Sequence, residues 1–113
     1  MARIPEVSPR AMAARLRADQ RWYVYLIVCK GGAIYTGIAR DVAARFAQHS
    51  AGTGARYTRA NPPLTLLAKF ACPNQSVASR MEAAIKKMNA ADKKKLAGKS
   101  GAAARRSVLD GTS

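Results

Sequence analysis

Acidic residues are scarce in this chain, and that shortage is the strongest feature of its composition. Six of the 113 residues are Asp or Glu and 20 are Lys or Arg, which gives a formal net charge of +14. Because like charges repel one another in a compact domain, we expect this excess to serve a polyanion. Nucleic acid, above all DNA, is the leading partner, and an anionic membrane surface is the weaker alternative.

Cysteine, histidine and long apolar runs are also in short supply. Two cysteines and one histidine cannot make a usual four-ligand zinc site. Cys29 and Cys72 lie far apart inside apolar segments, which is typical of buried free thiols in a reduced protein. No run reaches the roughly 20 apolar residues of a membrane span, and residues 1–20 lack the apolar core of a signal peptide. We therefore expect a cytoplasmic protein without a membrane partner.

The order of the expected elements predicts the fold class. The patterns of apolar residues and turns predict strands at residues 22–29, 33–38 and 64–72. Helical spacing predicts helices at residues 42–50, 76–89 and 92–96. The order β-β-α-β-α-α is typical of a small, single α/β domain, in which helices flank a three-stranded, mostly antiparallel sheet.

Three segments divide the chain. We expect residues 1–20 to be a basic, weakly ordered segment and residues 21–98 to form the domain. Residues 99–113 are small, polar and basic, so we expect a flexible tail. Inside the domain, residues 51–63 read as a polar, basic loop closed by two prolines.

Four side chains around a glycine-rich turn stand out as candidates for phosphate chemistry. Tyr25 and Tyr35 flank the turn, and Arg45 and His49 follow one helical turn apart. An arginine offers a fixed fork of donors to a phosphate, and a tyrosine hydroxyl can accept a proton when a nearby cation lowers its pKa. Each group alone is better explained as strand packing or as a solvated helix face.

Together these residues resemble the GIY-YIG nuclease family. Its first motif falls on Tyr23-Val24-Tyr25 and its second on Tyr35-Thr36-Gly37, so the reactive tyrosines are kept although other motif positions differ. The family's arginine falls on Arg45, a histidine found in many members on His49, and the metal-binding glutamate on Glu82. The resemblance covers residues 22–96 and is closest to small stand-alone bacterial members, relatives of the excision-repair incision subunit and of Slx-type nucleases.

The resemblance implies a DNA endonuclease that hydrolyses phosphodiester bonds with one Mg²⁺ or Mn²⁺ ion. Its substrates would be branched, flapped or single-stranded DNA in repair or recombination, with RNA not excluded. Tyr25 would be the base, Tyr35 would position the water or the phosphate, and Glu82 would bind the metal. Arg45 would stabilise the phosphate charge, and His49 would contact Tyr25 or the phosphate. The alternative is a nucleic-acid-binding module with the same fold and little or no catalysis.

Glu82 has two ordinary explanations beside the catalytic one. Ser79 and Glu82 match the spacing of a capping box at a helix start. Glu82 and Lys86 also have the spacing of a helical ion pair, which contributes only about 0.2–0.5 kcal/mol.

The length of the turn between the first two strands provides a geometric test. A two-residue loop, Gly31-Gly32, would place Tyr25 and Tyr35 on opposite faces of the sheet. A three-residue loop, residues 30–32, would pair Ile27 with Tyr35 and place both tyrosines on one face. The nuclease interpretation therefore predicts the three-residue loop.

Further basic and aromatic residues are candidate contacts to nucleic acid. They are Arg56, Tyr57, Arg59, Lys86, Lys87, Lys93 and Lys94. Tyr57 could stack on an unpaired base or could simply anchor its loop. We expect a monomer rather than an oligomer, and a domain this small could depend on a protein partner to select its substrate.

Overall fold

A three-stranded antiparallel sheet is the centre of the computed structural model, which describes residues 21–109. β1 (Trp22–Cys29) lies in the middle, between β2 (Ile34–Ala39) and β3 (Pro63–Cys72). Both neighbours pair with β1 in antiparallel register. The predicted α/β fold and antiparallel sheet are confirmed. β1 takes the central position because its apolar side chains on both parities can be covered on both faces.

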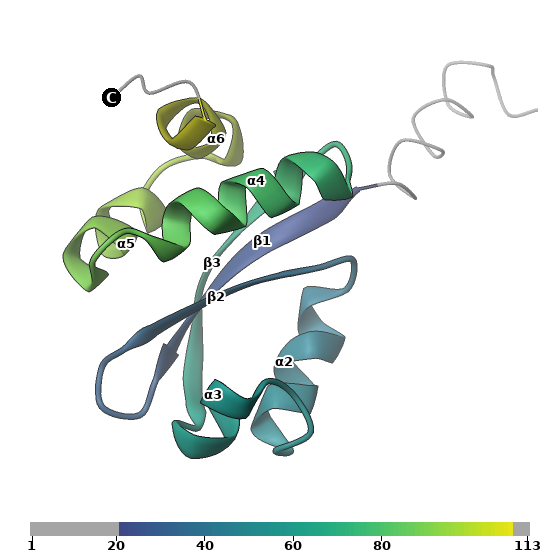
Figure 1. Ribbon diagram of the computed structural model, residues 1–113, viewed down its shortest axis with the longest axis vertical. Coiled ribbons are helices and arrows are strands. Elements are labelled where there is room, and N and C mark those ends of the chain that lie inside the picture. The colour runs from purple at the N-terminus through teal and green to yellow at the C-terminus, as the bar shows by residue number, and fades with distance from the viewer. Residues whose placement is uncertain (1–20, 110–113) are drawn as a thin grey trace, which may run out of the picture.

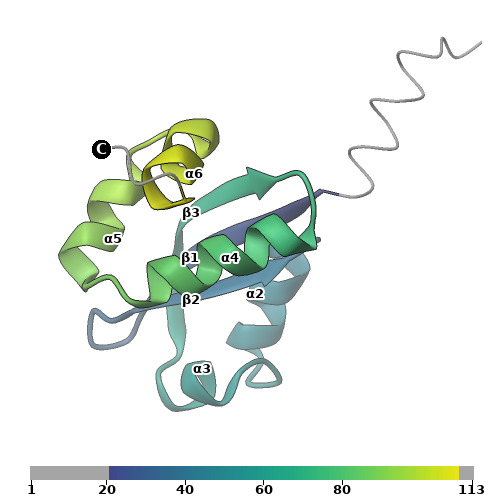
Figure 2. The same cartoon turned by 45° about the horizontal axis from the view of Figure 1, so that its top comes forward.

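Helices cover both faces of this sheet (Figures 1 and 2). In the described residues they are α2 (Val42–Ser50), α3 (Arg56–Ala60), α4 (Gln75–Lys86), α5 (Ala90–Ala97) and α6 (Gly101–Leu109). We call the side covered by α2 and α3 the α2 face, and the side covered by the last three helices the α4 face. β2 and β3 are the two edges of the sheet.

The larger apolar core lies on the α4 face. Side chains from β1, β3 and the three covering helices are buried together there: Val24, Leu26, Phe70, Cys72, Ala78, Met81, Ile85, Leu96 and Ala104. Met81 and Ile85 are four residues apart in α4, so they lie on one side of the helix and face the sheet. Cys29 and Cys72 are both buried free thiols, as the sequence predicts.

Side-chain caps fix where the helices begin. The Ala44 amide donates to Asp41 Oδ1 at 3.0 Å at the start of α2, as the sequence predicts. The Val77 amide donates to Asn74 Oδ1 at 2.9 Å at the start of α4. Because Asn74 caps α4, Glu82 lies well inside the helix, and the capping-box explanation for Glu82 is wrong.

Two expectations about irregular segments are wrong. Residues 51–63 are not wholly a loop, because they contain the short helix α3. Residues 101–109 are not a loose tail, because α6 packs on β3 and α4 with Ala104 fully buried. Small alanine side chains let this helix approach the sheet closely. The expectation for residues 1–20, and that for the last four residues of the tail, lie outside the described residues. None of the helices in residues 21–109 has the length and apolar character that crossing a membrane requires.

Candidate active site on the α2 face

The turn between β1 and β2 places both tyrosines on the α2 face. The Cys29 amide donates to the Ala33 carbonyl at 2.8 Å, which closes a three-residue loop over residues 30–32. Ile27 lies opposite Tyr35 in this register, as the three-residue prediction requires. The ring centroids of Tyr25 and Tyr35 are 6.2 Å apart, so the two rings can share one site.

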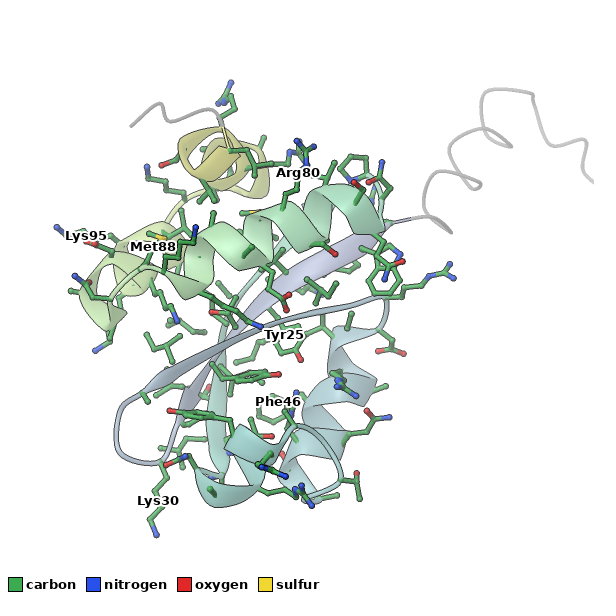
Figure 3. The ribbon with its side chains drawn as sticks, in the orientation of Figure 1. Tyr25, Lys30, Phe46, Arg80, Met88 and Lys95 are labelled. Carbon is green, nitrogen blue, oxygen red and sulfur yellow. The ribbon has the colours of Figure 1, made fainter. Side chains whose placement is uncertain are left out.

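Tyr25 is buried at the centre of this face, and its hydroxyl is held in place. Figure 3 shows its ring between the sheet and the helices of the α2 face. Tyr25 is 1% exposed, and its hydroxyl lies 2.8 Å from His49 Nε2. Gly37, directly opposite on β2, makes room for the ring, because a Cβ at this position would overlap the Tyr25 hydroxyl. The glycine of the second motif is therefore needed to seat the tyrosine of the first.

Thr58 orients His49 from the other side of the imidazole ring. His49 Nδ1 lies 2.7 Å from Thr58 Oγ1, and Thr58 Oγ1 donates to the Ala55 carbonyl at 2.9 Å. With its proton committed to Ala55, the threonine oxygen accepts from Nδ1–H, so Nε2 accepts the proton of Tyr25. The contact from the Ala55 amide to Nδ1 would need the other tautomer, but at 3.4 Å it is longer and weaker than the bonds of Thr58 at 2.7 and 2.9 Å.

The orienting role of Thr58 is not evident from the sequence. No motif marks this residue, which is buried only because the short helix α3 turns its hydroxyl toward α2. Gly54 contributes as well, since a Cβ there would overlap the His49 ring. A glycine and a threonine flanking a basic loop are common turn residues, so their role appears only in the folded chain.

Burial favours the neutral forms of the two tyrosines and of the histidine in this site. Burial and the neighbouring Tyr35 raise the pKa of Tyr25 to about 12, although Arg45 acts in the opposite direction. Burial also raises the pKa of Tyr35, again against the effect of Arg45. The pKa of His49 is lowered by burial and by the positive charge of Arg45. The neutral imidazole can therefore accept a proton, as the tautomer assignment requires.

Arg45 and Glu82 approach this site from different faces of the sheet. Arg45 lies on α2, where its Nη1 donates to Gln48 Oε1 at 2.9 Å. Glu82 lies on α4, next to the buried Met81, and its carboxylate is close enough to raise the pKa of both Tyr25 and Tyr35. The structure therefore places Tyr25, Tyr35, Arg45 and His49 on the α2 face, and Glu82 acts on the two tyrosines electrostatically from α4.

Among the residues that the structure describes, Glu82 is the only carboxylate that acts on the two tyrosines and could hold a divalent ion beside them. The other acidic residues within 21–109 are Asp41 and Asp92, each at a helix start elsewhere. No cluster of three or more His, Cys, Asp or Glu side chains occurs in these residues. Mg²⁺ keeps several waters and needs only one or two protein carboxylates with substrate phosphates, so a single glutamate fits it. The Glu82–Lys86 contact of 3.8 Å is long and partly exposed, and it leaves the carboxylate available.

Most of the expected nucleic-acid contacts lie at the surface, and one is buried. Tyr57 is 41% exposed and stacks on Tyr35 at an interplanar angle of 17°, while Arg56, Arg59, Lys86, Lys87 and Lys94 are exposed. Lys93 is the buried one, because it is only 9% exposed and its Nζ donates to the Ile34 carbonyl at 3.1 Å. The pattern of lysines in the sequence does not distinguish it from Lys94.

Comparison with known proteins agrees with the resemblance seen in the motifs. Residues 21–96 match the family model described as the GIY-YIG catalytic domain. A UPF0213 protein of Cupriavidus pinatubonensis is 51% identical over 78 residues, which cover 69% of this chain and 87% of that protein. A UPF0213 protein of Xanthomonas axonopodis pv. citri is 49% identical over 72 residues, covering 64% and 71% of the two chains.

A solved structure of the same kind is also similar to this chain. It is the solution NMR structure of a UPF0213 protein from Bacillus halodurans, which is 37% identical in sequence. The match covers 79% of this chain and 96% of the other, with a TM-score of 0.45. With the family model matched over most of the sheet and its helices, the chain belongs to the GIY-YIG nuclease domain family.

Proposed function

We propose that the chain is a divalent-metal-dependent endonuclease that hydrolyses phosphodiester bonds of branched, flapped or single-stranded DNA in repair or recombination. The observation that supports it most is the gathering of Tyr25, Tyr35, Arg45 and His49 on one face, within electrostatic reach of Glu82. An ordinary packing core would not need a carboxylate, a guanidinium and two hydroxyls together. The net charge of +14 supports a nucleic-acid substrate but does not distinguish cutting from binding.

In this proposal, Tyr25 and His49 work as a proton relay. Tyr25 accepts a proton from the attacking water while its own hydroxyl proton passes to His49 Nε2, 2.8 Å away. Thr58 keeps the imidazole in the tautomer that leaves Nε2 free to accept. With its pKa raised to about 12, Tyr25 is a weak acid in the free protein, so water attack depends on the cationic surroundings of the bound phosphate.

The remaining groups position and stabilise the phosphate. Tyr35 donates its hydroxyl to the water or to a phosphate oxygen beside Tyr25. Arg45 stabilises the negative charge that develops on the phosphate, since a guanidinium carries a positive charge and presents several donors. Glu82 would hold the divalent ion, which, when bound, supplies charge stabilisation to the phosphate and the leaving oxygen.

A cleavage assay tests this function. Labelled single-stranded, flapped, branched and duplex DNA are incubated with the protein and Mg²⁺ or Mn²⁺, with a chelator as the metal control. Glu82→Gln and Arg45→Ala are expected to abolish cutting. Asp92→Asn and Arg80→Ala are matched controls that remove the same charges away from the site and should cut normally; Arg80 lies on the outer side of α4 (Figure 3).

Two results would count against the proposal. Activity that survives both Glu82→Gln and Arg45→Ala would show that the site is assigned wrongly. Tight binding without cleavage of any substrate, with either metal, would instead support a nucleic-acid-binding module that keeps the fold.

A further inference from the structure

A cavity of about 290 Å³ lies at the open edge of β2, beside the candidate active site. Its lining comes from three parts of the chain: β2, α3 and the helices of the α4 face. The lining residues are Ile34, Tyr35, Thr36, Tyr57, Lys86 and Lys93. Tyr35 thus separates this cavity from the site around Tyr25. The volume is close to the lower limit of about 300 Å³ for ligand pockets, which suits a group the size of one nucleotide.

Lys93 is a buried cation with unused hydrogen-bonding capacity. Its side chain belongs to a residue only 9% exposed, and it makes no ion pair with any carboxylate within residues 21–109. Its ammonium has three donors, one of which is given to the Ile34 carbonyl at 3.1 Å. Burying an unpaired ammonium costs free energy, so this arrangement favours an anion in the cavity.

Thr36 also lines this cavity, and it carries a buried polar group without a partner in residues 21–109. The residue is 2% exposed, and its Oγ1 has no hydrogen-bond partner among the described residues. A buried hydroxyl without a partner is uncommon and calls for an explanation.

The backbone of β2 adds a further donor at this edge. Cys29 and Ala33 form a hydrogen-bonded pair, and hydrogen-bonded and non-bonded pairs alternate along an antiparallel ladder. Ile34 and Thr36 are opposite Val28 and Leu26 in the register, so their backbone groups point away from β1. The bond from Lys93 to the Ile34 carbonyl agrees with this direction, and the Thr36 amide points the same way.

We propose that this cavity binds a non-scissile phosphate of the nucleic-acid strand, held by Lys93 and by the hydroxyl and amide of Thr36. Lys86 stands at the exposed rim and completes the positive charge. Tyr57, stacked on Tyr35, forms the wall for the attached sugar or base. The proposal rests on nucleic acid being the substrate, and it places the strand across β2 with one phosphate on each side of Tyr35.

The electrostatics of the empty cavity agree with an anion site. Burial and the neighbouring Lys86 lower the pKa of Lys93. A phosphate between the two ammonium groups would remove the second cause by replacing repulsion with attraction to both.

Binding of the full chain to a fluorescent oligothymidylate without divalent metal tests this site, since no cleavage then occurs. Lys93→Met should weaken binding severalfold and reduce the steepness of the log–log salt dependence by about 0.7, the loss of one phosphate contact on a single strand. Thr36→Val should weaken binding without changing that steepness, because the lost hydroxyl is uncharged. Thr36→Ser keeps the hydroxyl and should bind as tightly as the wild type.

Lys95→Met is the matched control, because it removes the same charge from the same helix at an exposed position (Figure 3). It should change the salt dependence by much less than Lys93→Met does. If Lys93 only ties α5 to β2, Lys93→Met will lower the melting temperature and leave the salt dependence of folded protein unchanged, and the proposal fails. Equal effects of the two lysine variants would overturn it as well.

Titrations followed by NMR distinguish a strand phosphate from free phosphate. The Thr36 amide signal should shift with oligothymidylate at lower concentration than with inorganic phosphate, and neither should shift it in Lys93→Met. A shift with inorganic phosphate alone would overturn the strand proposal. The nuclease proposal can fail independently of this one. In that case the wild-type protein would bind DNA and lose affinity in Lys93→Met, but it would cleave no substrate.

Discussion

On the α4 face of the sheet, Met81 and Ile85 are fully buried among apolar side chains. On the α2 face, the largest buried side chain is Tyr25, whose hydroxyl is bonded to a buried histidine. The two faces share the same central strand, with alternate residues of β1 pointing to each. The α4 face thus holds the domain together, and the α2 face can bury polar groups that would destabilise an ordinary core.

Replacing the tyrosine hydroxyl should separate activity from stability most clearly. We expect Tyr25→Phe to lower the cleavage rate by about 100- to 10,000-fold, the usual contribution of acid–base catalysis. Its stability should change by only about 1 kcal/mol, because one hydrogen bond is lost. Tyr23→Phe, on the same strand and face, is the control and should cut at the wild-type rate. An equal loss of cleavage rate in Tyr23→Phe would show that Tyr25 has no particular role in catalysis.

A deletion in the apolar core of the α4 face should have the opposite result, a loss of stability without a loss of activity. Met81→Ala should lower the free energy of unfolding by about 2–5 kcal/mol, the range for deleting a large buried side chain. Urea unfolding measures this change. Below the melting temperature, the folded variant should retain its cleavage rate. A variant of normal stability would contradict the assignment of the main core to the α4 face.

A pair of glycine replacements compares the faces with the same chemical change. Gly37→Ala adds a methyl group against the Tyr25 ring, and we expect a loss of about 1–3 kcal/mol of stability, together with reduced cleavage. Gly101→Ala adds one at the start of α6, where the nearest atom, the Ala71 amide nitrogen, is 3.5 Å away. That variant should be nearly neutral. Thermal melts and cleavage rates of both variants should be measured side by side.

The smallest effect concerns the pH dependence of stability. Because the pKa of His49 is lower in the folded protein than its usual value of about 6.5, the unfolded chain binds the proton more tightly. The contribution of His49 is therefore complete above about pH 6.5 and decreases as the pH falls below that value. The groups that surround the ring are Tyr25, Tyr35 and the positive charge of Arg45, and the pKa of both tyrosines is raised further above this range.

Urea unfolding at pH about 7.5 and about 5.5 measures this dependence. His49 is the only histidine of the chain, so His49→Gln should remove most of the difference. A variant that keeps the whole difference would locate the pH dependence elsewhere.

The three strands, the helices α2, α4 and α5, and the five candidate site residues could be predicted from the sequence because each has a local signal. β1 is recognisable from its apolar run, α2 from Asp41, and the site from two short motifs at suitable spacing. Whether Tyr25 and Tyr35 lie on one face of the sheet depends on the number of residues in the turn. The sequence links the two because successive side chains of a strand point to opposite faces.

What the sequence did not reveal depends on contacts between distant segments. Thr58 orients His49 only because α3 packs against α2. Lys93 is buried only because α5 returns to the edge of β2, 59 residues from its partner Ile34. The helix α6 was missed because its alanines carry little amphipathic pattern and become ordered by packing on β3. Secondary-structure propensities depend on neighbouring residues in the sequence, so they do not predict contacts between distant segments.

The glycine turn at residues 30–32 has an implication for protein engineering. Gly31 and Gly32 are exposed and have open space around them, which ordinarily marks a good place to insert a label or to shorten a loop. Here an insertion or deletion of a single residue that shifted the pairing would rotate alternate side chains of β2 through the sheet and carry Tyr35 away from Tyr25. Tags and fusions therefore belong at other surface positions. Natural variants of this domain should keep both the length of the turn and its two glycines, because φ is +90° at Gly31 and +87° at Gly32.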